Sequence, residues 1–158
     1  MSEHREPIVI GWTEFVDLPE WGVKRLRAKV DTGARTSALH VENIEELPRG
    51  FVSFDVVLHR KKRDRRIRIR AKVSRRGRVR SSTGHLTTRL FVETTLRLGP
   101  VEKRVEVSLV DREKMIHRML LGRAAISGPF LVDVDRRMAT RARKKKARKK
   151  KVRKKVKA

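Results

Sequence analysis

A strict alternation of apolar and basic side chains ahead of Asp31 limits what this chain can fold into. Leu26, Ala28 and Val30 alternate with arginine and lysine residues, a period of two that is typical of a β-strand with one buried face. Similar patterns predict strands within residues 51–58, 67–73, 86–98, 101–110 and 130–134. Turn-forming segments separate several of these strands, namely Arg60–Arg66, Gly77 and Gly99-Pro100. Many short strands joined by turns indicate an all-β fold.

Two short segments complete the predicted body of the protein. Met119–Leu121 is apolar throughout, which suits a strand that is buried on both faces. Arg123–Ile126 is predicted to form a helical turn. The 158 residues suit one domain, and we expect a flexible segment 1–7, a β domain 8–137 and a basic tail 138–158.

The charge of the chain is strongly positive and unevenly spread. There are 43 lysine and arginine residues against 18 acidic ones, a net charge of +25. Arg141–Ala158 alone holds 13 basic residues and no acidic one. We expect this tail to be disordered when free, or helical on an anionic surface, because like charges repel. It is either a solubilising or anchoring tail, or a non-specific contact for RNA that weakens with salt.

The composition also restricts the compartment and the chemistry. Cysteine is absent, which excludes disulfides, thiolate catalysis and cysteine-based metal sites. The charged segment 1–7 lacks the apolar core of a signal peptide, and no apolar run approaches the ~20 residues that span a bilayer. We therefore expect a cytoplasmic protein that does not enter a membrane.

The turn formed by Asp31, Thr32 and Gly33 carries the chemistry that the sequence offers. Gly33 lets the backbone adopt angles that a side chain forbids, and the Thr32 hydroxyl can bond across to a partner segment. Two such carboxylates brought face to face share a proton. One then acts as general base on a water, and the other as general acid toward a peptide carbonyl. Taken alone, the motif also fits a plain β-turn, since Asp and Gly favour turns.

That chemistry needs two aspartates, whereas the chain holds one Asp-Thr-Gly sequence. A two-fold interface places the same surface of both subunits in contact. We therefore expect a homodimer in which Asp31 faces the same residue of a second copy.

Two segments resemble the retropepsin-like aspartic peptidases. Members of this family carry an apolar strand into Asp-Thr-Gly-Ala, and later an apolar-apolar-Gly-Arg segment that packs behind the active-site loop. Val30–Ala34 and Leu120–Arg123 match these two patterns. The resemblance implies a single-lobed closed barrel with Asp31, Thr32 and Gly33 as catalytic residues. It also implies that the site is supported by Leu120, Leu121, Gly122 and Arg123.

One bacterial group of this family, often labelled ATP-dependent zinc protease, is the most similar. The similar segments are Ile10–Trp12, Lys29–His40, Ser81–His85, Thr95–Gly99 and Arg118–Arg123, and the resemblance covers about Ile8–Asp133. Members of the group are associated with RimK-type ATP-grasp glutamate ligases. This implies a partner of that kind and an acidic substrate such as a glutamate-modified protein tail.

Substrate contacts are expected from two segments. Ala34 and Arg35 follow the catalytic turn, and the resemblance places Ser82, Thr83, Gly84 and His85 where retropepsins have a flap over the substrate. An ordinary hairpin turn is the alternative for the second segment. For Arg35 three roles stay open: a subunit interface, a contact with a substrate carboxylate, or a local ion pair.

The group label implies zinc and ATP, but the motif implies an aspartic peptidase that needs no cofactor. No Gly-x-x-x-x-Gly-Lys-Ser/Thr loop and no His-Glu-x-x-His sequence occurs. Asp31, His40 and His85 are the candidates to converge on a metal, but a surface or hydrogen-bonded role suits each of these histidines better. We expect no metal, and less than one zinc per chain after dialysis. The alternatives are a zinc-dependent protease, or a non-catalytic ribosome- or RNA-binding protein.

Overall fold

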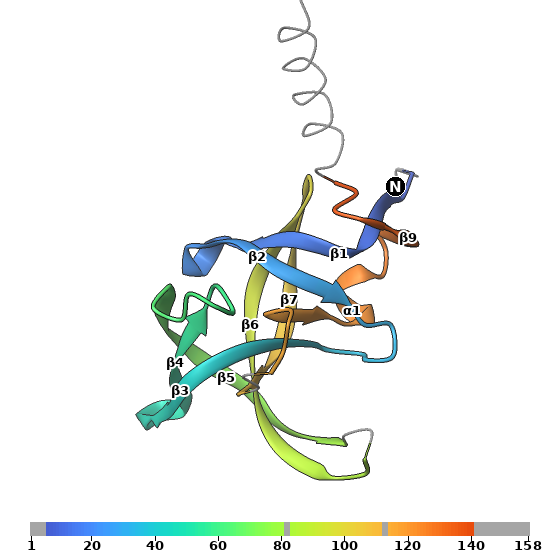
Figure 1. Cartoon of the computed structure of the whole chain (residues 1–158). Coiled ribbons are helices and arrows are strands. Elements are labelled where there is room, and N and C mark those ends of the chain that lie inside the picture. Colours follow the sequence, from blue (N-terminus) through green and yellow to red (C-terminus); the bar gives the residue numbers. More distant parts are fainter. Residues whose placement is uncertain (1–5, 81–82, 112–113, 141–158) are drawn as a thin grey trace, which may run out of the picture.

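The computed structural model describes residues 6–80, 83–111 and 114–140, and these residues form a mostly β structure (Figure 1). Its strands are β1 (Ile8–Leu18), β2 (Val23–Val30), β3 (Ser37–Leu47), β4 (Phe51–Val57), β5 (Arg66–Arg80), β6 (Leu86–Leu98), β7 (Val101–Val110), β8 (Met119–Leu121) and β9 (Phe130–Arg137). One short helix, α1 (Arg123–Ile126), and two 3-10 turns, Pro19–Trp21 and Pro48–Gly50, complete it. The predictions for residues 1–5 and for Arg141–Ala158 lie outside the described residues.

The strands form one sheet that closes into a near-barrel ring. Their order is β4-β5-β6-β7-β3-β8-β2-β1-β9, and additional pairings join β4 to β3 and β6 to β1. The prediction of an all-β, barrel-like body is confirmed at this level. No helix in the described parts of the chain is long and apolar enough to cross a membrane.

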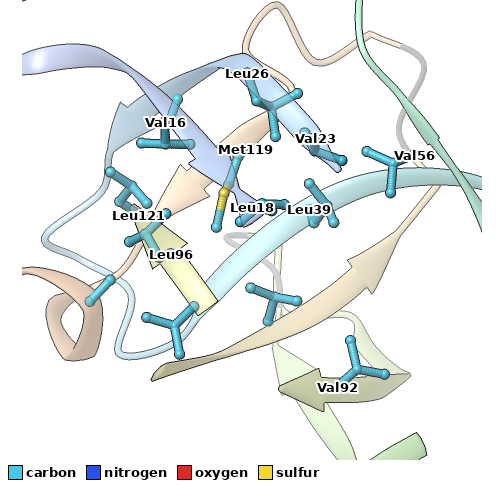
Figure 2. Packing of buried hydrophobic residues seen from close by; sticks show 14 of the residues in the cluster. Val16, Leu18, Val23, Leu26, Leu39, Val56, Val92, Leu96, Met119 and Leu121 are labelled. Carbon is cyan, nitrogen blue, oxygen red and sulfur yellow. The ribbon is translucent and has the colours of Figure 1, made fainter. Parts of the chain in front are cut away.

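The predicted alternation places one face of β2 in the core. Leu26 and Ala28 are fully buried, whereas Val30 is only partly buried as the strand ends. Figure 2 shows Leu26 and its neighbours on β2 converging with Leu39 of β3 and Met119 of β8. Burial of this apolar cluster holds together the strands that carry the Asp31 turn.

The expectation of a turn at Gly77 was wrong. Gly77 lies inside β5 and pairs with Arg89 of β6, so the two strands form one hairpin that extends well beyond the body (Figure 1). A Cβ atom at Gly77 would lie 2.6 Å from Cε2 of Phe91. Glycine is therefore needed here to make room for an aromatic ring, rather than to reverse the chain.

A buried carboxylate joins the two ends of the described body. Glu14 of β1 is fully buried and accepts hydrogen bonds from the backbone N–H groups of Gly11 and Ala139, both at 2.7 Å. Its other oxygen accepts one from the Thr140 hydroxyl at 2.7 Å. These bonds hold Ala139 and Thr140, which follow β9, against β1.

Truncation of Leu39 tests the contribution of this core. The Leu39 side chain is fully buried in the apolar core cluster, so Leu39→Ala is expected to lower the free energy of unfolding by about 3 kcal/mol. Leu86→Ala is the matched control, because Leu86 is 54% exposed and should cost about 0.5 kcal/mol or less. Urea denaturation measures both; equal losses would contradict the placement of Leu39.

Candidate active site

Asp31 lies directly after β2, in the loop that leads to β3. Its backbone N–H donates to the Leu121 carbonyl at 2.8 Å. Its carboxylate oxygen Oδ1 accepts the Gly33 N–H at 3.1 Å, and its carbonyl accepts the Ala34 N–H at 3.3 Å. These bonds fix both the backbone and the carboxyl group at the strand end.

The segment Leu120–Gly122 lies against this loop, as the resemblance implied. Val30 of β2 is the parallel partner of Leu121, and Ala38 of β3 is the antiparallel partner of Leu120. A Cβ atom on Gly122 would lie only 2.6 Å from the carbonyl oxygen of Thr36. Only glycine permits so close an approach of two backbones.

Arg123 ties the same loop from its other side. Its backbone N–H donates to the Ala34 carbonyl at 2.8 Å, and its guanidinium Nη1 donates to the Thr32 carbonyl at 2.9 Å. The next residue, Ala124, donates its N–H to the Arg35 carbonyl at 3.0 Å. Arg123 therefore supports the backbone of the loop.

A cavity of about 550 Å³ opens beside Asp31. Its walls come from the loop, from β3, β7 and β8, and from the β5–β6 hairpin. The lining residues are Asp31, Gly33, Ala34, Arg35, Thr36, Ala38, Val79, Arg80, Arg89, Phe91, Ser108, Val110, Met115 and Leu120. Among these, Asp31 is the one acidic residue and three are arginines, so a lone carboxylate lies in a cationic cavity.

The structure brings together only part of the predicted substrate-binding set. Ala34 and Arg35 line the cavity, whereas Thr83, Gly84 and His85 lie at the turn of the β5–β6 hairpin and do not. Ser82 lies outside the described residues. The hairpin still bounds the cavity, but with residues from its stem.

Sequence reasoning missed these stem residues, which include Val79, Arg80, Arg89 and Phe91. Arg89 and Phe91 are two positions apart on β6, and such residues share one face of a strand. The spacing shows that Arg89 and Phe91 lie on one face of β6. It does not show that this face of the strand turns toward Asp31.

The suggested metal cluster does not form in the residues described here. His40 is fully buried, with its Nε2 atom 3.0 Å from Oε2 of Glu42. Burial opposes ionisation of Glu42, but hydrogen bonds from His40 and Arg63 hold the pKa of its carboxyl below the usual value. No group of three His, Asp or Glu side chains suited to a metal occurs in the described parts of the chain. These residues do not fit a zinc site.

Comparison with protein families identifies the relationship. Residues 9–146 match the RimB-like family model, described as retropepsin-like aspartic endopeptidase RimB. The chain belongs to this family. The resemblance drawn from Val30–Ala34 and Leu120–Arg123 is thereby confirmed, and the family is one of enzymes.

The curated relatives are longer proteins. A protein of Shewanella halifaxensis named probable alpha-L-glutamate ligase is 38% identical over 138 residues, which cover 84% of this chain and 29% of the relative. A protein of the same name from Parasynechococcus marenigrum is 39% identical over 132 residues, 80% of this chain and 28% of the relative. The chain thus spans less than a third of these proteins.

A solved structure has a similar fold. The crystal structure of a Legionella pneumophila protein of unknown function (DUF785) is 25% identical, with a TM-score of 0.70. The match covers 85% of this chain and 99% of that one. The β architecture described above therefore recurs over nearly the full length of that crystallised chain.

Substitution of Gly122 tests the backbone contact behind the loop. Gly122→Ala is expected to lower the free energy of unfolding by about 3 kcal/mol, because a rigid backbone faces the new methyl group. Gly22→Ala is the control: Gly22 has a positive φ but open space around it, and the change should cost about 1 kcal/mol. Thermal and urea unfolding measure both, and an equal cost at the two glycines would contradict the contact.

Proposed function

We propose that this protein is an aspartic endopeptidase whose active site forms when two copies bring their Asp31 carboxylates together. The observation that carries the proposal is the fixed Asp31 carboxylate, which lies as the lone acidic group on the wall of a cationic cavity. Family membership supports the same activity. Mechanism, substrate and assembly are what the proposal adds.

The proposed reaction is hydrolysis of a peptide bond by a water held between the two carboxylates. One Asp31 is ionised and removes a proton from the water as its oxygen bonds to the peptide carbonyl carbon. The other is protonated and gives its proton to the carbonyl oxygen. The first Asp31, now protonated, gives its proton to the nitrogen as the C–N bond breaks. The second takes back a proton from a hydroxyl of the intermediate as the carboxylic acid product forms. Two close carboxylates sharing one proton have the required split in pKa.

The site of one subunit lacks the second carboxylate that the proposed reaction needs. Asp31 has no acidic neighbour among the described residues that line its cavity. Thr32 and Gly33, next to it, are exposed, and a two-fold interface over this loop would bring both aspartates to one place. The site of a single chain is therefore half of the proposed dyad.

The charge of the cavity favours an acidic substrate. Arg35, Arg80 and Arg89 lie on its walls, and a cleft of one sign concentrates ligands of the opposite sign. The curated relatives carry the name glutamate ligase and extend far beyond the matched region. We infer that the peptidase acts beside an ATP-grasp glutamate ligase, on peptides or protein tails rich in glutamate.

Replacement of the catalytic aspartate is the direct test. Asp31→Asn keeps the size of the side chain but removes the base and the acid, so kcat on glutamate-containing peptides should fall by about a thousandfold or more. Mass spectrometry of peptide-library digests measures the loss, with circular dichroism as a check on folding. A chelator should leave the wild-type rate unchanged. Full activity of the variant, or loss of activity on chelation, would overturn the proposal.

A mixing experiment tests the shared site. When wild type is equilibrated with a ninefold excess of Asp31→Asn, most wild-type chains pair with an inactive partner, and activity per wild-type chain should fall about tenfold. The same excess of an unrelated carrier protein is the control. Undiminished activity would show that each chain works alone.

A further inference from the structure

A second cavity adjoins the one that contains Asp31. It measures about 370 Å³ and shares two lining residues, Arg35 and Thr36, with the first. Its remaining walls come from β5, β7 and α1, and they consist of Arg75, Arg104, Val105, Glu106, Ala124 and Ala125. Arg35 and Thr36 therefore lie where the two cavities meet.

Two arginines of the second cavity are already paired with acids of the same chain. Arg75 lies 2.8 Å from Glu106 across β5 and β7, and Arg104 forms an ion pair with Glu20. Their charges are thus partly compensated, and the pairs hold the side chains in place. They shape the walls of the cavity rather than offering a free cation.

The base of this cavity is also fixed. Lys103 donates from its Nζ atom to the carbonyls of Ala124 and Ser127, at 3.0 and 3.2 Å. Burial lowers the pKa of this lysine, and both of these hydrogen bonds reach residues of α1 or the residue that follows it. The helix that forms one wall therefore has a fixed position.

Arg35 differs from its neighbours because its side chain has no partner among the described residues. It is exposed, and no ion pair or side-chain hydrogen bond to it is found in the described chain. The local ion pair that the sequence left open is therefore absent there. The backbone of Arg35 is nevertheless held, since its carbonyl accepts the Ala124 N–H at 3.0 Å and lies next to Gly122.

A guanidinium with a fixed backbone and no internal partner is suited to bind a carboxylate, which it can hold through two parallel hydrogen bonds. We propose that Arg35 is a specificity-determining residue that binds an acidic side chain of the substrate at the junction of the two cavities, at one position to one side of the cleaved bond. This inference rests on the proposed peptidase function. It assigns the preference for acid to a single residue and a single substrate position.

The test uses pairs of peptides that differ at a single position, with glutamate in one and glutamine in the other. In a series of cleavable peptides, each glutamate is replaced in turn by glutamine, which keeps the shape and removes the charge. For wild type, one replacement near the cleaved bond should raise KM by about tenfold, the value of one charge-assisted contact. In Arg35→Ala the KM for the parent peptide should rise by a similar factor. The glutamate-to-glutamine change in the peptide should then raise the KM of this variant no further. The kcat should stay unchanged, because Arg35 does not touch the reacting atoms.

Arg27→Ala serves as the matched control. Arg27 is an exposed arginine of β2 that lines neither cavity, so its removal lowers the net charge equally. It should leave KM and its dependence on each glutamate as in wild type. If Arg27→Ala and Arg35→Ala raise KM alike, general attraction of charge explains the effect and the specific contact is refuted.

Two further measurements separate the remaining outcomes. Analytical ultracentrifugation of Arg35→Ala should show the same self-association as wild type; a weakened dimer with an unchanged glutamate preference would mean that Arg35 belongs to the interface instead. Binding of fluorescent peptides to Asp31→Asn, with and without Arg35→Ala, needs no cleavage. If the wild type itself cleaves no peptide, a glutamate preference in binding that depends on Arg35 would sustain this inference while the peptidase proposal fails.

Discussion

The structure of the site depends on one set of backbone hydrogen bonds between segments about ninety residues apart. The loop after β2 binds the β8–α1 segment through the Asp31 N–H, the Ala34 carbonyl and the Arg35 carbonyl. Arg123 reaches the Thr32 carbonyl across 91 positions of sequence. Loops at a surface usually keep the freedom that such bonds remove. Here these bonds hold the loop in place, so the carboxylate has a defined position.

That rigid loop presents different groups on its two sides. Asp31 faces the larger cavity with a carboxylate held by a backbone amide. Arg35, only four residues later, presents a cation where the two cavities meet. Because the same β8–α1 segment fixes the backbones of Asp31 and Arg35, the fold sets the distance between the proposed catalytic carboxylate and the proposed binding guanidinium. The proposed chemistry and the proposed specificity therefore share one structural cause.

The sequence predicted best the features that short-range patterns encode. Alternation identified β2 and most of β4 to β7, and the apolar run before Gly122 identified β8. It did not show that Gly77 accommodates the ring of Phe91, or that His40 is buried against Glu42. Both depend on which strands become neighbours. The stem of the β5–β6 hairpin was missed as a cavity wall for the same reason, since alternation gives the faces of a strand but not what they face.

The buried Glu14 carboxylate has a consequence for how the domain is held. By binding Ala139 and Thr140, it fixes the last described residues of the chain, and Thr140 lies beside Gly99. The turn of the β5–β6 hairpin is at the other end of β6, whose thirteen residues span up to about 40 Å. Figure 1 shows this turn at the bottom of the view and the end of the described chain at the top. Thr140, which directly precedes the basic residues in the sequence, is thus held at the end of β6 that lies away from the turn of the hairpin, whose stem bounds the Asp31 cavity.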